Sequence, residues 1–112
     1  MEPIVEIQNL PNGVLVILQT AHLHMYHIPE FREIMGKEIH NRPEKVILDL
    51  ANVNYLDSSA LGAIFAIHKE IQSYGGKFVL INLNQTIRMV FRLTRADALL
   101  LTAESLDDAQ KL

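Results

Sequence analysis

The chain has 112 residues, 49% of them hydrophobic, and a formal net charge of −3. This length fits one domain, and the 39 Leu, Ile, Val and Phe residues can form a hydrophobic core that needs no covalent cross-links. The absence of cysteine excludes disulfides, thiolate metal sites and cysteine nucleophiles. The negative charge argues against a protein that coats nucleic acid. No apolar run approaches the roughly 18 residues of a membrane span, and the first ten residues lack the features of a signal peptide. We therefore expect a cytoplasmic protein.

The N-terminal part of the chain predicts a hairpin followed by a helix. Two apolar segments, residues 4–10 and 14–18, flank the turn signal Pro11-Asn12-Gly13 and predict two antiparallel strands. Residues 20–27 show no clear pattern. Apolar residues then recur with the spacing of one helical face, and a proline suits the first helical turn, so a helix is predicted over residues 28–40.

The central part predicts a buried strand and a buried helix. Residues 46–50 form a short run rich in β-branched residues, and residues 52–56 are expected to form a loop. Two adjacent apolar rows then predict a helix that begins at Asp57-Ser58-Ser59 and is buried over a wide arc. Gly75-Gly76 should end this helix.

The C-terminal part predicts two further strands and two helices. Residues 77–81 form a strand, and Asn84 can cap a helix over residues 85–92. Residues 98–101 are expected to form the last strand and residues 105–111 a short terminal helix. The resulting order, β-β-α-β-α-β-α-β-α, implies an α/β fold with a mixed sheet of four to five strands and crossover helices.

The candidate chemistry lies where the strand of residues 46–50 leads into the long helix. Asp57, Ser58 and Ser59 stand at the helix start, where side-chain oxygens commonly accept hydrogen bonds from free backbone N–H groups. Simple capping is therefore one interpretation. The other is a phosphate site, because a helix N-terminus favours an anion. A phosphate on this surface would add close to two negative charges without unfolding the domain, as a docking switch requires.

Several motifs together resemble a known family. They are the strand VILDL, the loop VNYLD, the segment Ser58-Ser59-Ala60-Leu61-Gly62, the pair Gly75-Gly76 and the strand KFVLI. Their order resembles the STAS domain, the sulfate-transporter and anti-sigma-factor-antagonist domain, and within it the single-domain bacterial anti-sigma factor antagonists. The resemblance covers nearly the whole chain, so residues 1–112 are expected to form a single STAS domain.

The resemblance implies a function and its site residues. In the family the first serine of the pair is phosphorylated, which corresponds to Ser58, with Asp57 and Ser59 beside it. The unmodified antagonist binds an anti-sigma factor that is also a serine kinase with a histidine-kinase-like ATP fold, and this frees the sigma factor. Phosphorylation releases the antagonist, and a metal-dependent serine phosphatase resets it. The antagonist itself is expected to be no enzyme and to need no cofactor.

Two differences from the family pattern affect the expected docking surface. The family has glycine where Ala60 stands, and its Gly-Glu-Leu-Asp corresponds here to Ala21-His22-Leu23-His24, so histidines replace both acids. We expect the partner to dock on the helix start and on the loop of residues 22–27. The predicted docking residues are His22, His24, Asp57, Ser58, Ser59, Ala60, Leu61 and Gly62.

The histidines allow other interpretations. In an extended segment His22 and His24 would share one face, and with His27 they could ligate zinc or nickel. No nearby acid supplies a second shell, so no metal site is assigned. His68 lies on the apolar face of the long helix and is expected to be buried or half-buried. A hydrolase is disfavoured because the Gly-x-Ser-x-Gly pattern is absent.

Arg88, Arg92 and Arg95 have a spacing that predicts a basic face on the third helix. This face could be solvated or could bind an acidic partner, but it lacks the interleaved aromatic residues that stack on bases. We expect neither a nucleic acid nor a membrane as partner. The alternatives to an antagonist are a constitutive STAS scaffold or subunit of a signalling or lipid-transport complex, and a small enzyme or metal protein that uses the histidines.

Overall fold

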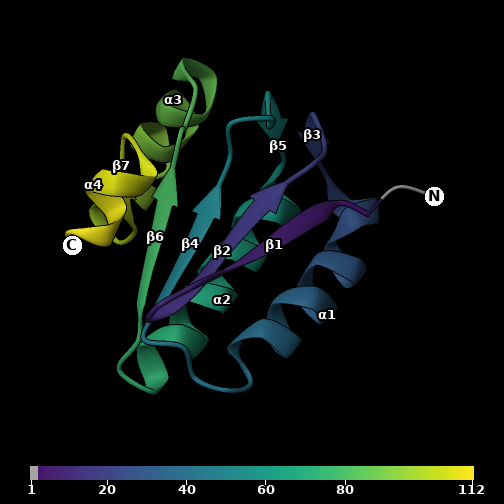
Figure 1. Ribbon diagram of the computed structural model, residues 1–112. Coiled ribbons are helices and arrows are strands. Elements are labelled where there is room, and N and C mark those ends of the chain that lie inside the picture. Colours follow the sequence, from purple (N-terminus) through teal and green to yellow (C-terminus); the bar gives the residue numbers. More distant parts are fainter. Residues whose placement is uncertain (1–2) are drawn as a thin grey trace.

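The structure, a computed structural model, describes residues 3–112. It contains a five-stranded sheet in the order β1-β2-β4-β6-β7 and a separate two-stranded sheet formed by β3 and β5 (Figure 1). The strands are β1 (Val5–Leu10), β2 (Gly13–Leu18), β3 (His22–Leu23), β4 (Lys45–Asp49), β5 (Tyr55–Leu56), β6 (Lys77–Ile81) and β7 (Leu101–Ala103). The helices are α1 (Ile28–Ile39), α2 (Ser58–Ser73), α3 (Gln85–Leu93) and α4 (Leu106–Gln110), with 3-10 turns η1 (Met25–His27) and η2 (Ala96–Ala98).

The sheet is mixed, as the sequence predicts. β1 and β2 form the antiparallel hairpin, with Val5 opposite Leu18, and the other neighbours in the sheet pair in parallel. Gly13 is required where β2 begins, because a Cβ atom there would lie only 1.8 Å from the carbonyl oxygen of Lys45. This close approach fixes the hairpin against the start of β4.

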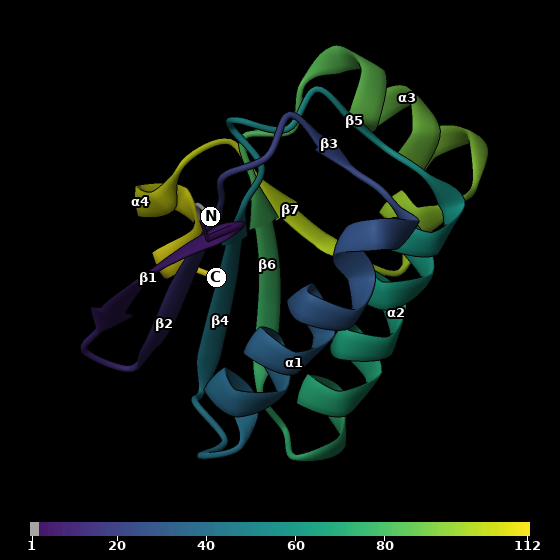
Figure 2. The same ribbon diagram turned by 90° about the vertical axis from the view of Figure 1, so that its right-hand side faces the viewer.

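Helices cover the two faces of the sheet unequally. α1 and α2 lie on one face, and the short α4 lies on the other (Figure 2). The predicted wide apolar arc of α2 is confirmed, because six of its side chains are buried: Ala60, Leu61, Ala63, Ile64, Ile67 and Ile71. Within residues 3–112 no helix has both the length and the apolar character needed to cross a bilayer.

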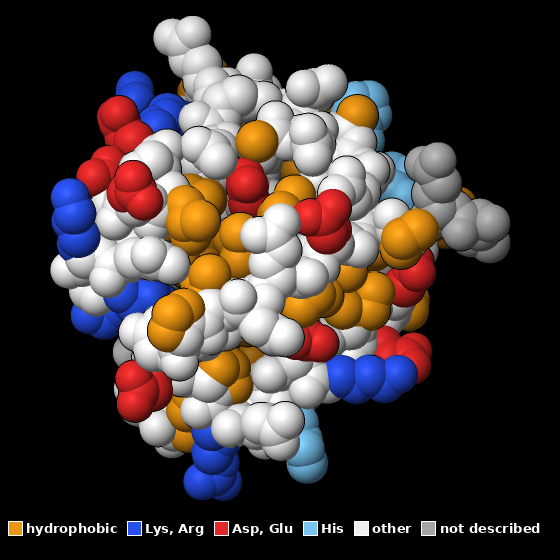
Figure 3. Space-filling view, in the orientation of Figure 1, with side chains coloured by type: hydrophobic (Ala, Val, Ile, Leu, Met, Phe, Trp, Pro, Cys, Tyr) orange, Lys and Arg blue, Asp and Glu red, His pale blue; other side chains and the backbone are white. Residues whose placement is uncertain are grey.

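The face under α4 carries a second, smaller apolar cluster built on Leu15, Ile47, Val79 and Ile81, against which Ala109 packs. Hydrophobic side chains are visible across the middle of this face in Figure 3. Lys45 is buried beneath the helix. Its Nζ donates to three carbonyl oxygens at the end of the chain, those of Ala109 (3.0 Å), Gln110 (2.8 Å) and Leu112 (2.8 Å).

The predicted end of α2 is confirmed in detail. Gly75 has a φ of 82°, a left-handed conformation that glycine adopts without strain. Its N–H donates to the carbonyl of Gln72 at 3.1 Å, and the N–H of Gly76 donates to that of Ile71 at 3.0 Å. These bonds close the last helical turn and redirect the chain into β6.

Three expectations are wrong. The predicted loop at residues 52–56 contains strand β5, which is too short to show an alternating pattern. The last strand is Leu101–Ala103 and not residues 98–101, because Arg95 takes a left-handed φ of 64° and the chain then forms η2. For the same reason Arg95 lies beyond the end of α3, so the predicted basic face of that helix retains only Arg88 and Arg92.

Candidate functional site

The start of α2 is defined by the carboxylate of Asp57. Asp57 has extended backbone angles, and its Oδ1 accepts a hydrogen bond from the N–H of Ala60 at 2.9 Å. A carboxylate in this position satisfies a free N–H and complements the positive end of the helix dipole. Of the three candidate residues at the helix start, Asp57 therefore provides the side-chain cap. The hydroxyls of Ser58 and Ser59 are not needed for it.

Asp57 also connects α2 to the segment before α1. Its Oδ2 accepts a hydrogen bond from the N–H of Met25 at 3.0 Å, and its own N–H donates to the carbonyl of Leu23 at 3.1 Å. The parallel pairing of β3 with β5 places Leu23 opposite Leu56, directly before Asp57. Both views show β3 and β5 side by side near the start of α2 (Figures 1 and 2). The two segments that the sequence assigned to docking therefore form one continuous unit.

The predicted docking residues of α2 divide into exposed and buried sets. Ser58, Ser59 and Gly62 are exposed, whereas Ala60 and Leu61 are buried in the core. The side chain of Ala60 consequently points inward and adds nothing to the surface. Only the exposed three, together with the partly exposed Asp57, can meet a partner directly.

Gly62 has no structural requirement within this chain. No atom lies within 4 Å of the position that a Cβ would occupy, and its φ is not positive. Glycine inside a helix costs roughly 1 kcal/mol relative to alanine. An exposed glycine one turn after Ser58 leaves the helix surface open to close approach by another molecule.

The histidines lie beside this helix start. His22 is exposed on β3, with its ring edge-on to that of Tyr55 at a centroid distance of 6.3 Å. His24 is half-buried and caps η1, and its ring lies 4.1 Å from that of His27. His24 and His27 thus form a pair, while His22 lies apart from them against the aromatic ring of β5.

Three large side chains are exposed in the same region, two of them within the predicted docking loop of residues 22–27 and one outside it. They are Met25 (59% exposed), Tyr26 (82%) and Tyr55 (49%). The hydrogen bond from the Met25 N–H to Asp57 holds Met25 next to the start of α2. Tyr55 immediately precedes Leu56 in β5. Nothing in the local pattern distinguishes these residues from core residues, because their exposure depends on the β3–β5 pairing. We define the α2 docking surface as His22, His24, Met25, Tyr26, Tyr55, Asp57, Ser58, Ser59 and Gly62.

The two other candidates from the sequence, a metal site and His68, have less support in the structure. Among residues 3–112 no three His, Asp or Glu side chains come together as metal ligands. His68 is half-buried, as predicted, beside Ile71 and Leu99 at the other end of α2.

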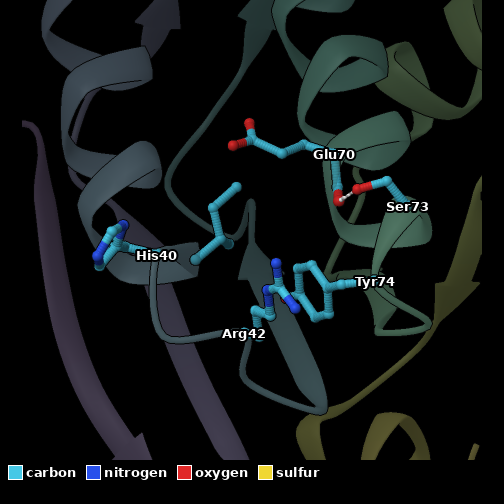
Figure 4. Close-up of a pocket in the computed structure, with 6 residues that line it drawn as sticks. His40, Arg42, Glu70, Ser73 and Tyr74 are labelled. Carbon is cyan, nitrogen blue, oxygen red and sulfur yellow. Dashed lines mark hydrogen bonds between the residues drawn. The ribbon is translucent and has the colours of Figure 1, made fainter.

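A cavity of about 300 Å³ also lies near the C-terminal ends of α1 and α2, lined by Ile39, His40, Arg42, Glu70, Ser73 and Tyr74 (Figure 4). Its hydroxyl groups are engaged internally. Ser73 Oγ donates to the carbonyl of Glu70 at 2.6 Å, and Tyr74 Oη donates to that of Pro43 at 2.9 Å. The cavity shares no residue with the α2 docking surface.

The fold and these motifs agree with a known family. A sequence model of the STAS domain matches residues 6–109. The chain belongs to the STAS domain family. This confirms the resemblance that the motifs indicated and accounts for the mixed sheet.

Two curated STAS relatives are similar over most of the chain. A Thermotoga maritima protein, provisionally named an anti-sigma factor antagonist, is 28% identical over 101 residues, 89% of either chain. The anti-sigma F factor antagonist of Paenibacillus polymyxa is 28% identical over 83 residues, which cover 73% of this chain and 71% of that one.

Solved structures show the same fold. A Thermotoga maritima crystal structure with the same provisional name superposes with a TM-score of 0.84 at 28% identity, covering 96% of this chain and 92% of the other. SpoIIAA of Bacillus in its phosphorylated form superposes with a TM-score of 0.72 at 18% identity, covering 96% of each chain. The latter likeness concerns the fold alone.

Proposed function

We propose that this STAS domain is an anti-sigma factor antagonist whose docking to an anti-sigma factor is switched by phosphorylation of Ser58. The names of the relatives support the general role. The observation that carries the switch is the position of Ser58. It is the exposed first residue of α2, Asp57 provides the cap in its place, and it forms part of the α2 docking surface.

The local electrostatics suit a reversible phosphate. The N-terminus of α2 presents free N–H groups and the positive end of the helix dipole, which favour an anion. The carboxylate of Asp57 opposes it by repulsion, but both of its oxygens are already held by backbone N–H groups. A phosphate on Ser58 would therefore leave the fold intact and change the charge of the surface. The phosphorylated form of SpoIIAA, which shares this fold, is consistent with that behaviour.

The chain acts in this scheme as a binding module and not as an enzyme. The phosphate donor would be the partner itself, an anti-sigma factor that is a serine kinase with a histidine-kinase-like ATP fold. A metal-dependent serine phosphatase would remove the phosphate. Sigma factor control places all these proteins in the cytoplasm.

The first test is the intact mass and peptide map of the protein isolated from its own cells with phosphatases inhibited. We expect a fraction with one phosphate at Ser58. No phosphate under several growth conditions would contradict the switch and favour a constitutive scaffold.

The second test is copurification of tagged variants from the same cells, followed by identification of bound proteins. Ser58→Ala should retain a kinase with a histidine-kinase-like domain, and Ser58→Asp should lose it because of the added charge. Ser73→Ala and Ser73→Asp are the matched controls, since Ser73 is an exposed serine at the opposite end of α2. Equal recovery with Ser58→Asp and wild type would contradict the proposal.

A further inference from the structure

His24 and His27 cap the turn η1 reciprocally. Nδ1 of His24 accepts a hydrogen bond from the N–H of Tyr26 at 3.3 Å, and Nδ1 of His27 accepts one from the N–H of His24 at 3.5 Å. Serine or threonine with glutamate or glutamine normally forms this arrangement at the start of a helix. Here two imidazoles form it, and an imidazole nitrogen accepts only while it carries no proton.

Protonation of the pair would remove both contacts and place two positive charges close together. The ring centroids are 4.1 Å apart, with the planes tilted by 32°. His27 is also the N-cap residue of α1, where the positive end of the helix dipole disfavours a cation. The observed conformation therefore requires neutral rings, and a proton on either ring opposes it.

The charged and titratable groups adjacent to the pair come from three elements. They are Tyr26 of η1, whose ring is edge-on to that of His24 at 5.6 Å, Glu30 in the first turn of α1, and Asp57 at the start of α2, whereas His22 faces Tyr55 and lies apart from the pair. Asp57 and Glu30 are the two groups that would favour a cation. Asp57 already accepts two backbone N–H groups, one of them from Met25 within the turn itself. Opening of η1 would therefore also disturb the contact that orders the start of α2.

We propose that His24 and His27 make the α2 docking surface sensitive to protons, so that protonation opens η1 and weakens docking. The turn carries Met25 and Tyr26, the two most exposed large side chains of that surface. The docking conformation is complete while both rings are neutral and is lost when either ring takes up a proton at its acceptor nitrogen. The consequence for docking rests on the proposed function, whereas the opening of the turn does not.

The test is amide hydrogen exchange and NMR of the ¹⁵N-labelled full chain from about pH 5 to about pH 8, the range in which imidazole titrates. We expect exchange of the Tyr26 and His24 amides, corrected for the intrinsic rate, to rise by up to about tenfold as the pH falls, the equivalent of one lost hydrogen bond. The double variant His24→Asn, His27→Gln keeps both acceptors without titrating, so its exchange should stay flat. His40→Gln, a change at the other end of α1, should behave as wild type. Unchanged exchange while both rings titrate, or an equal response in the double variant, would overturn the proposal.

Docking is then measured at about pH 7.5 and about pH 6 with the kinase identified through the Ser58 variants, on either side of the imidazole range. Weaker docking of wild type at the lower pH, restored in the double variant, supports the proposal. Equal docking at both values overturns the proposal and leaves the proposed function standing. Docking at neither value contradicts the proposed function, and the exchange data then decide the behaviour of the turn separately.

Discussion

Asp57 and Met25, 32 residues apart in the chain, are joined by a hydrogen bond of 3.0 Å from the Met25 N–H to Oδ2 of Asp57. The same carboxylate caps α2 through its other oxygen. One side chain therefore sets both the start of the long helix and the position of the turn before α1. This explains how two segments that the sequence treats separately become one surface.

Replacement of Asp57 should affect both stability and docking. Asp57→Ala removes the cap and the contact to Met25, so we expect a loss of about 1–2 kcal/mol in the free energy of unfolding, measured by urea denaturation. Docking should weaken as well, because the turn is released. Ser105→Ala is the matched control, since Ser105 caps α4 through the N–H of Asp108 at 3.1 Å, far from this surface in sequence. Similar docking losses in the two variants would show that the effect is only destabilisation.

Replacement of Gly62 by alanine should raise stability and weaken docking. Gly62→Ala is expected to raise the free energy of unfolding by about 0.5–1 kcal/mol, because alanine favours the helix and nothing obstructs its Cβ. The same methyl group would hold a partner away from α2, so docking should weaken. Gly36→Ala in α1 offers the same open space away from the α2 docking surface and should stabilise the domain without affecting docking. A Gly62→Ala variant that docks as tightly as wild type would contradict this role.

Tyr26 should contribute to docking and not to folding. It is the most exposed of the large side chains described, so Tyr26→Ala should change the free energy of unfolding by no more than about 0.5 kcal/mol. Aromatic residues at the centre of an interface often account for about 2 kcal/mol or more of binding, and we expect a loss of that order by calorimetry. Leu99→Ala, at an exposed residue beside the opposite end of α2, should leave binding unchanged. Equal losses in both variants would contradict a localised surface.

Tyr74 should make the domain less stable at high pH. Burial, together with the nearby carboxylate of Glu70, raises the pKa of its phenol above the ordinary value. The folded protein thus holds this proton more tightly than the unfolded chain. The stabilising contribution is complete below about pH 10 and is lost as the pH rises above it. Thermal unfolding from about pH 8 to about pH 11 should show a drop that is smaller in Tyr74→Phe. An identical drop in the variant would assign the effect to other groups.

The main elements could be predicted because their patterns are local. The apolar rows of α2, the run in β4 and the cap at Asn84 each depend on residues within one or two turns, and the structure contains them all. β3 and β5 have two residues each and exist only because they pair with one another across 33 residues of sequence. No local period can indicate such a pair.

The site could be predicted only in part, for the same reason. Asp57 and Ser58 follow from cap chemistry and from the family motif, and Gly62 follows from the motif. Met25 and Tyr55 become surface residues through the β3–β5 pairing, and the burial of Ala60 depends on which way α2 faces the sheet. The family motif therefore included the buried Ala60, and the local pattern did not indicate the exposure of Tyr55.

The buried ammonium of Lys45 binds the segment after α4 through backbone carbonyl oxygens and not through side chains. Every amino acid offers a carbonyl, so the identities of residues 110–112 are free to vary while their length and path are constrained. Related chains could therefore diverge in these last residues and still keep α4 over its face of the sheet.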